Sequence, residues 1–563
     1  MDLHAPLVEC VPNFSEGRDM AIIGRITAAI EAVEGVRLLD VDPGKATNRT
    51  VVTFVGHPDA VVEAAFQAIR VAAELIDMRK HTGEHPRMGA TDVCPFIPVA
   101  NVSMEEVAEL ARRLARRVGD ELDIPTYLYE AAASAPYRSN LAVIRSGEYE
   151  GLAQKLKDPQ WQPDFGPAVF NARSGATVIG ARDFLVAYNV NLNTTSVRRA
   201  NSVAFDVREQ GRVLREGDPV TGKVLTDAEG EPLRQPGTCK SVKGIGWYIE
   251  EYGIAQVSMN LTNIRDTPLH LAFEACCDAA QKRGMRVTGS ELVGLVPKQV
   301  MLDAGRYFLH KQERSTGISD EEIIRIAVKT MGLDELSPFD PRKKIIEYQL
   351  EEPGQNRLIA MDLRQFARET AAETPAPGGG SISAYVGALG ASLAGMVANL
   401  SAHKRGWDDR WQEFSDWAEK AQAIQERLLF LVDEDTRAFN AIMEAFAMPK
   451  SNDIEKASRT AAIQAATRHA IIIPFTVMEA IYDLLPVLEA MVKEGNPNSV
   501  SDGGVGMLCA RAAMHGAWLN VQINASGYKD KAELEDLLIK GFHMAEQADQ
   551  IERNLIEVVK RKI

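Results

Sequence analysis

Residues 81–89 hold two histidines, a carboxylate and a guanidinium within one short stretch of the chain. A histidine suits general base chemistry, because its ordinary pKa lies close to physiological pH. His85 is the stronger candidate, since His81 follows a predicted helix, where a histidine can simply stabilise the helix dipole. Arg87 has the geometry to hold a carboxylate through two parallel hydrogen bonds. The alternative interpretation is a polar turn whose charges face water.

Acidic and polar side chains also gather upstream, at the end of a predicted strand. Asp40 and Asp42 end that strand, and the turn after it leads to Asn48 and Arg49. Because a strand end and the loops beside it share one rim of a sheet, we expect these residues near the His85 loop. A carboxylate beside a histidine suits acid–base chemistry, and an arginine there is a candidate for holding a carboxylate substrate.

A long irregular segment around residues 164–175 combines glycines with an aromatic ring and an amide. Phe170 and Asn171 are suited to line a pocket for a flat heterocycle, and a plain connection between two domains is an equal alternative. The candidate binding residues of this segment are Gly166, Pro167, Ala168, Val169, Phe170, Asn171, Ala172, Arg173, Ser174 and Gly175.

In the C-terminal part, Asp435 falls seven residues after Leu428 on an otherwise apolar helical stripe, whereas Asp433 and Glu434 point away from it. A carboxylate on a buried stripe costs free energy unless it is paired or protonated, so we expect its pKa to be perturbed. A catalytic acid and a structural ion pair are equal alternatives for Asp435.

A proline- and glycine-rich run, residues 374–381, leads directly into a predicted helix. Free backbone N–H groups and the helix dipole make such a junction an anion site, with Ser381 as the candidate ligand. A flexible domain entry capped by Ser381 is the alternative.

Hydrophobic periodicity predicts two successive α/β modules with the element order β-α-β-β-α-β, which is the order of ferredoxin-like folds. The predicted elements of the first are strand 7–12, helix 19–33, strands 36–42 and 48–56, helix 58–78 and strand 92–99. Those of the second are strand 184–191, helix 195–210, strands 245–250 and 254–261, helix 267–283 and strand 287–292.

Within the second module, residues 211–243 form a polar insert. Its residues 217–223 match the pattern GxxxxGK, but Val224 replaces the Ser or Thr that would hold magnesium. We therefore predict a solvent-exposed loop and not a phosphate-binding loop.

Beyond a linker at 351–358, apolar residues recur at three- and four-residue spacing over 380–403, 409–447, 454–492, 500–526 and 531–561. This pattern predicts an all-α helical bundle. Glycines 387, 390 and 395 are expected to let helices approach closely. The fold class is thus tandem ferredoxin-like α+β modules followed by a bundle, with domains at 1–184, 185–350 and 359–563.

Composition narrows the classes of function. A net charge of −15 argues against non-specific nucleic-acid binding, which relies on a basic face. The N-terminus lacks the pattern of a signal peptide, and the longest weakly polar stretch, 386–400, is too short to span a bilayer, so we expect no membrane insertion. Six scattered cysteines without CxxC pairs suggest a reducing cytoplasm and no metal site.

Taken together, the motifs resemble the family of bifunctional formimidoyltransferase–cyclodeaminases over nearly the whole chain. The matching segments are 7–17, 47–50, 83–89, 92–99, 164–167 and 292–297, followed by 374–381, 432–435 and 501–502. The 211–238 insert is longer than expected for animal members and stands away from the matched site residues.

The resemblance implies transfer of a formimino group from N-formimino-L-glutamate to N5 of tetrahydrofolate, in histidine degradation and one-carbon metabolism. The bundle would then close the product to 5,10-methenyltetrahydrofolate and release ammonia. His85 matches the family's transferase histidine, Asp42 a carboxylate beside the substrate, 166–175 the folate-contacting segment, and Asp435 the cyclodeaminase acid/base. Tetrahydrofolate, in polyglutamylated form, is the implied co-substrate. The implied assembly is a homo-oligomer, with the octamer of animal members as one candidate.

Arg49 or Arg87 would hold substrate carboxylates. One alternative is a working transferase with an inert or cyclohydrolase-like bundle. A non-enzymatic RNA-binding module is disfavoured by the acidic composition and by the lack of aromatic RNA-binding strands.

Overall fold

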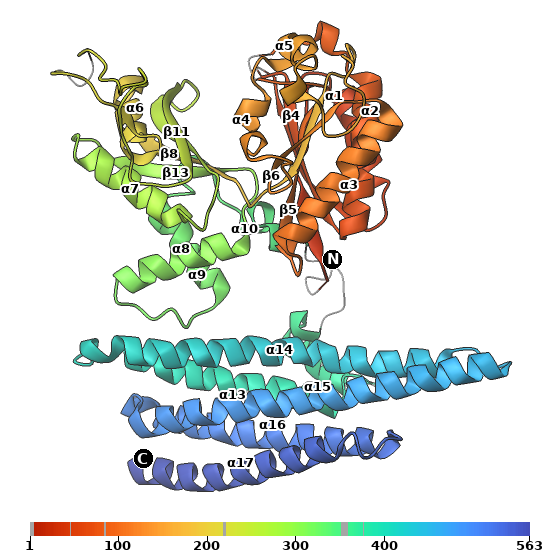
Figure 1. Ribbon diagram of the computed structural model, residues 1–563. Helices are drawn as coiled ribbons and strands as arrows, with labels where there is room; N and C mark the ends of the chain where they lie inside the picture. The colour runs from red at the N-terminus through yellow and green to blue at the C-terminus, as the bar shows by residue number, and fades with distance from the viewer. Residues whose placement is uncertain (1–4, 46, 84–85, 218–220, 351–357, 375) are drawn as a thin grey trace. The chain divides into compact units, whose positions relative to one another are not determined.

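The computed structural model describes residues 5–45, 47–83, 86–217, 221–350, 358–374 and 376–563 (Figure 1). It divides into two units. One comprises Met1–Ala304 and Val328–Pro353, and the other comprises Gly305–Ala327 and Gly354–Ile563. The first is a mixed α/β unit and the second is helical, as the hydrophobic periodicity predicted.

The predicted order of elements occurs at the start of the α/β unit. In order these are β1 (Leu7–Cys10), α1 (Met20–Glu31), β3 (Val36–Gly44), β4 (Arg49–Gly56), α2 (Pro58–Leu75) and β5 (Thr91–Ala100). The first predicted strand is broken, because a second short strand, β2 (Asn13–Phe14), follows Pro12. Val52, Phe54 and Phe96 of the sheet and Val61 and Ile69 of α2 are among the residues of one shared apolar core.

This first sheet is larger than a single β-α-β-β-α-β module. β6 (Thr126–Glu130) and β7 (Thr177–Ala181) extend it in the order β1-β4-β2-β5-β7-β6, with β3 paired to β4. β7 lies parallel to both β5 and β6, and α3 (Met104–Leu122) provides the crossover that a parallel connection requires. The sheet therefore includes two strands from the region after residue 99, in which the sequence predicted no strand.

The second sheet has the strand order β11-β12-β8-β13, and all its pairs are antiparallel. Its elements are β8 (Val186–Leu192), α6 (Val197–Val207), β11 (Val242–Ile249), β12 (Ile254–Leu261), α7 (Leu269–Gln281) and β13 (Val287–Val293). This is the element order predicted for the second module.

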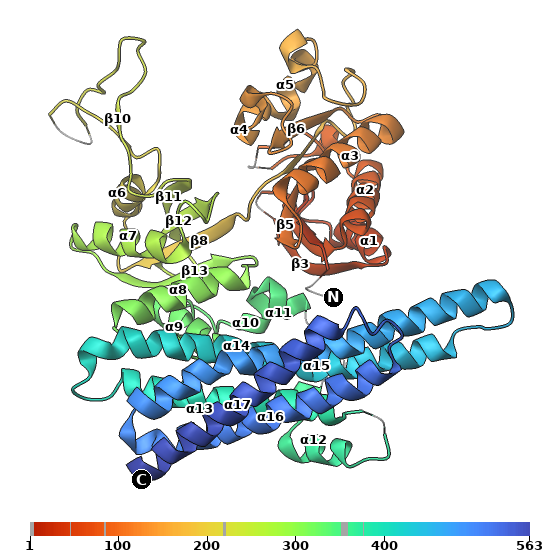
Figure 2. The ribbon, with the colours of Figure 1, turned by 60° about the horizontal axis from the view of Figure 1, so that its bottom comes forward.

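The insert between α6 and β11 contains one short strand pair, β9 (Arg212–Val213) with β10 (Arg234–Gln235). Most of its described residues are exposed, in keeping with the predicted solvent loop, and Figure 2 shows the β10 region extending away from the second sheet. Part of the GxxxxGK match, residues 218–220, lies outside the described residues.

In the helical unit, long helices run side by side (Figures 1 and 2). They are α13 (Gly379–Ala402), α14 (Trp411–Ala447), α15 (Asp453–Glu494), α16 (Val500–Gly527) and α17 (Glu535–Lys562). These bounds confirm the predicted bundle. Small residues bring α13 and α16 together, since a Cβ on Gly390 would lie 2.9 Å from the carbonyl oxygen of Gly506. A Cβ on Gly395 would meet only ordinary van der Waals contact, at 3.5 Å from Ala421.

Helices α13 and α15 are long and apolar enough to cross a membrane by length and composition, which corrects the shorter apolar length expected from the sequence. However, 56% of the most apolar window of α13 and 67% of that of α15 are buried inside the structure. Such burial is typical of core helices in a bundle.

Candidate active sites

The loop that carries the first candidate site runs between the 3₁₀ turn η1 (Met78–Lys80) and β5. His85 lies outside the described residues, but both flanks of the loop are defined. Asn48 adopts a left-handed conformation, with φ of 50°, and its side chain donates to the carbonyl of Thr82 at 3.0 Å. A Cβ on Gly83 would lie 2.2 Å from the carbonyl oxygen of Thr47, so only glycine lets the two loops approach this closely.

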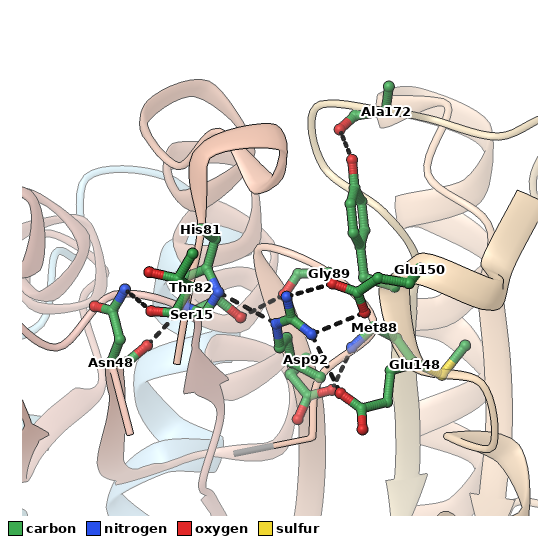
Figure 3. A network of polar contacts seen from close by, with 12 residues as sticks. Ser15, Asn48, His81, Thr82, Met88, Gly89, Asp92, Glu148, Glu150 and Ala172 are labelled. Atoms are coloured by element: carbon green, nitrogen blue, oxygen red, sulfur yellow. Dashed lines mark hydrogen bonds and ion pairs between the residues drawn. The ribbon is translucent and has the colours of Figure 1, made fainter. Parts of the chain in front are cut away.

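His81 is held at both ring nitrogens. Its Nε2 lies 2.9 Å from the carbonyl oxygen of Asn48, and its Nδ1 accepts a hydrogen bond from Nε of Arg87 at 3.2 Å (Figure 3). These partners require a neutral ring with its proton on Nε2. His81 therefore joins two loops, which agrees with its weaker ranking as a base.

We expected Arg87 to bind a carboxylate of the substrate, but in the structure it binds two carboxylates of the chain. Its guanidinium donates to both carboxylate oxygens of Glu150, at 2.9 and 2.7 Å, and to Glu148 at 3.2 Å (Figure 3). Both acids belong to α5 (Glu148–Lys155). Burial acts to lower the pKa of Arg87, but the hydrogen bonds to Glu150 and Glu148 outweigh it and raise that pKa. Arg87 therefore connects the loop to α5 through these two ion pairs.

An open cavity of about 530 Å³ lies over this network. It is lined by His81, Thr82, Gly83, Arg87, Gly147, Glu148 and Glu150. The cavity places the polar loop beside solvent, where a small molecule has access to it.

Asp42 and Arg49 lie on neighbouring strands. Asp42 is exposed on β3, where its backbone is opposite Val51 of β4. Arg49 begins β4, and its Nε donates to Oδ1 of Asn13 at 2.8 Å. Burial lowers the pKa of Arg49 to about 10. Asn48, the residue before Arg49, contacts both Thr82 and His81, so it connects the start of β4 with the His81 loop.

Segment 166–175 lies against the loop that carries His81 and Arg87. The N–H of Ala176 donates to the carbonyl of Met88 at 3.1 Å, and that of Met78 donates to the carbonyl of Arg173 at 2.9 Å. Tyr149 donates its hydroxyl to the carbonyl of Ala172 at 2.5 Å, and its ring lies 5.5 Å from that of Phe170. The segment is therefore built into the loop cluster and is more than a plain connection between domains.

Sequence reasoning missed a buried ion pair beneath these loops. Asp92 is 1% exposed, accepts from the N–H of Met88 at 3.0 Å and forms an ion pair with Arg145. Arg145 follows α4 (Leu141–Ile144), far from Asp92 in sequence. The sequence analysis found no signal for this pair, because the two residues lie 53 positions apart.

In the helical unit, the two C-terminal candidates meet. Oδ2 of Asp435 on α14 accepts from the backbone N–H of Ser381 at 2.8 Å and from its hydroxyl at 3.0 Å. Ser381 stands in the first turn of α13, whose N-cap is Gly378. We expected a substrate anion at this helix N-terminus, but the structure has the carboxylate of Asp435 there. The alternative expectation, that Ser381 caps the helix, is also wrong, because the N-cap residue is Gly378.

Burial raises the pKa of Asp435, and the hydrogen bonds from the Ser381 side chain and backbone oppose that effect. The carboxyl group is packed closely, since a Cβ on Gly380 would lie 2.1 Å from its Oδ1. The residue as a whole is half-buried, so the expected full burial on the apolar stripe is only partly correct.

Asp433, which we expected to point away from the apolar stripe, is buried in the structure. It is 8% exposed, and its Oδ1 accepts from the backbone N–H of Leu358 at 2.7 Å. Asp433 therefore has a structural contact that the helical stripe did not predict. Within the described part of the chain, no group of three or more His, Cys, Asp or Glu side chains is placed to hold a metal ion.

Two polar centres on two compact units are the arrangement of a bifunctional enzyme, and the comparisons with known proteins agree with it. Residues 7–182 match the formiminotransferase domain, N-terminal subdomain, residues 187–351 match the formiminotransferase domain, and residues 362–540 match formiminotransferase-cyclodeaminase.

Curated relatives cover both halves together and each half separately. The formimidoyltransferase-cyclodeaminase of Rattus norvegicus is 45% identical over 525 residues, 93% of each chain. The glutamate formimidoyltransferase of Thermoplasma acidophilum is 44% identical over 54% of this chain and 92% of its own length. The methenyltetrahydrofolate cyclohydrolase of Methylorubrum extorquens is 33% identical over 36% of this chain and 97% of its own. The chain belongs to the formimidoyltransferase-cyclodeaminase family.

Proposed function

We propose that the α/β unit transfers the formimino group of N-formimino-L-glutamate to N5 of tetrahydrofolate and releases glutamate. The helical unit then closes 5-formiminotetrahydrofolate to 5,10-methenyltetrahydrofolate and releases ammonia. The observation that carries this proposal is the presence of two polar centres, each on the half of the chain that matches the corresponding family model.

In the transferase reaction, N5 attacks the amidine carbon of formiminoglutamate, and the bond from that carbon to the glutamate nitrogen breaks. His85, through its match to the family motif, is the proposed base that takes the proton from N5. Asp42 is the proposed carboxylate beside the substrate, and residues 166–175 are the proposed folate contacts. The clustering of that segment with the His81 loop supports this assignment.

In ring closure, N10 attacks the formimino carbon, and the former imino nitrogen leaves as ammonia once it has been protonated. Asp435 is the proposed group that moves these protons. A carboxyl group whose pKa is raised by burial suits this role, because it exchanges protons nearer to neutral pH. Ser381 orients the carboxylate through two hydrogen bonds.

The remaining expectations belong to the same proposal. They are ferredoxin-like topology of both modules, a polyglutamylated folate, a place in histidine degradation, a cytoplasmic location and a homo-oligomeric assembly. The strand order of the second sheet supports the first of these.

Two variants test the assignment of roles. Asp435→Asn should lower ammonia release from synthetic 5-formiminotetrahydrofolate by about 100-fold or more, with glutamate release unchanged. His85→Ala should lower glutamate release by a similar factor and leave ammonia release from 5-formiminotetrahydrofolate unchanged. The assays follow glutamate, ammonia and the methenyl product separately. A loss of both activities in either variant, with the protein still folded, would contradict two separate sites.

A second candidate for the helical unit is hydrolysis of 5,10-methenyltetrahydrofolate, because one relative of this half is named a cyclohydrolase. Incubating the intact protein with the methenyl compound distinguishes the two. Conversion to 10-formyltetrahydrofolate without any ammonia-releasing activity would favour the cyclohydrolase.

A further inference from the structure

The cavity over the His81 loop exposes its acids more than its one arginine. Glu148 and Glu150 line it with side chains that are 42% and 64% exposed, whereas the side chain of Arg87 is 11% exposed. Figure 3 shows the two carboxylates around the guanidinium, between it and the open side of the network. A molecule that enters the cavity therefore meets carboxylates before it meets the guanidinium.

The charges of the described lining residues do not balance. Glu148 and Glu150 contribute two negative charges, Arg87 contributes one positive charge, and the ring of His81 is neutral in its present contacts. One negative charge is therefore left over. Arg87 donates to both oxygens of Glu150 but to only one oxygen of Glu148. Because a carboxylate accepts several hydrogen bonds, Glu148 keeps the capacity to bind a further cation.

The backbone holds Glu148 at the wall of the cavity. Gly147 and Glu148 are both left-handed, with φ of 87° and 52°. The N–H of Glu148 donates to the carbonyl of Arg145 at 2.7 Å, which fixes this turn at the start of α5. A left-handed backbone is unfavourable for glutamate, so the turn places this carboxylate at a cost in free energy.

The formimino group of the proposed donor substrate has the complementary charge. An amidine is a strong base, so the group is a cation at neutral pH. Like a guanidinium, it is planar and has N–H donors that match a carboxylate. The carboxylates of the same substrate are repelled by the two acids, so the formimino end enters the cavity first. That end carries the carbon that is transferred.

We propose that Glu148, assisted by Glu150, binds the formimino cation of formiminoglutamate in this cavity and selects it over a neutral amide. This inference rests on the proposed transfer reaction. Binding the group as a cation favours the reaction, because the positive charge withdraws electrons from the carbon that N5 attacks. Glu148 is thus a substrate-binding residue that determines specificity for the donor.

The test compares two ligands that differ in this charge. In N-formyl-L-glutamate an oxygen replaces the imino nitrogen of N-formimino-L-glutamate, which removes the positive charge. Without tetrahydrofolate no transfer occurs, so titration calorimetry on the full-length protein measures both dissociation constants. The wild type should bind the formimino compound about 10-fold or more tightly than the formyl compound. In Glu148→Gln this ratio should fall to near unity, through weaker binding of the formimino compound.

Further variants separate charge from shape. Glu148→Asp keeps the charge and suits a left-handed backbone, so its ratio should stay above that of Glu148→Gln. Glu150→Gln changes a residue in the first turn of α5 and should lower the ratio by roughly threefold, even if Glu148→Gln does not fold. Glu121→Gln is the matched control, because Glu121 is a partly exposed acid paired with one arginine, Arg117, elsewhere in the unit. It should keep the wild-type ratio.

A ratio near unity in the wild type would overturn the inference. So would a wild-type ratio that persists in the folded Glu148→Gln and Glu150→Gln variants. A wild-type protein that prefers the formimino compound but transfers no formimino group to tetrahydrofolate would instead overturn the proposed function. The two failures are therefore distinguishable.

Discussion

The two candidate sites are stabilised in different ways. In the α/β unit, loops from several elements are joined by polar contacts of partly exposed side chains, such as Arg87 with Glu148 and Glu150, which are 42% and 64% exposed. In the helical unit, one carboxylate, that of Asp435, meets the first turn of a single helix. One site depends on a distributed network, and the other on the close approach of two helices.

This difference has consequences for how each site fails. Ion pairs with exposed acids are screened by salt and are individually weak, so a distributed network loses function gradually. The carboxylate of Asp435 is held by the first turn of one helix, so a single carbon atom added to that turn is enough to displace it. The predictions below test this contrast, from the largest expected effect to the smallest.

The largest effect should come from Gly380→Ala. The new Cβ would lie 2.1 Å from Oδ1 of Asp435, so the carboxylate has to move. Moving the carboxylate away from its position should lower the rate of ring closure by about 100-fold and leave formimino transfer unchanged. Gly395→Ala on the same helix is the control, because its Cβ meets only ordinary contact. Normal ring closure in Gly380→Ala would show that the tight packing is not required.

The network of the α/β unit should respond less to Arg87→Met. The variant removes the bonds from Arg87 to Glu148, Glu150 and His81 but leaves the contacts of Asn48. We expect the kcat of transfer to fall by roughly 10-fold, with ring closure unaffected. Arg79→Gln, which breaks an exposed pair with Asp77, should be near wild type. If Arg87→Met raised only the KM for formiminoglutamate, Arg87 would bind substrate after all.

The pH dependence of ring closure should change in Ser381→Ala. The hydroxyl of Ser381 stabilises the charged form of Asp435 and so opposes the rise of its pKa by burial. Without the hydroxyl the pKa rises further, so the acidic limb of the rate profile should move to higher pH. At neutral pH the rate should fall by roughly two- to fivefold. The profile of formimino transfer in the same variant is the internal control, and an unmoved acidic limb of ring closure would show that Ser381 does not tune Asp435.

The smallest effect should come from Tyr149→Phe, which removes one hydrogen bond to the carbonyl of Ala172 in segment 166–175. We expect the KM for tetrahydrofolate to rise by about fivefold or less, with kcat nearly constant. Tyr137→Phe removes a comparable bond to Gln160 elsewhere in the unit and should leave this KM unchanged. An equal effect of both variants would point to general destabilisation.

Much of the architecture could be predicted because local patterns dictate it. Apolar spacing defined the helices of the bundle to within a few residues, and the β-α-β-β-α-β order appeared in both modules. The extension of the first sheet by β6 and β7 was missed, because pairing partners distant in sequence leave no local signal. The choice of His85 over His81 stays a prediction, because His85 lies outside the described residues, and the contacts of His81 show only that its ring joins two loops.

The amino-acid sequence by itself determined the types of residue available, the helices and strands that carry them, and the family to which the chain belongs. Only the tertiary structure decided which of them meet. It joined Asp435 to the start of α13, gave Arg87 two acids as partners and paired Asp92 with Arg145, 53 residues away. The physical reason is that periodicity reports which face of an element is buried, whereas a polar contact depends on the packing of elements that are remote in sequence.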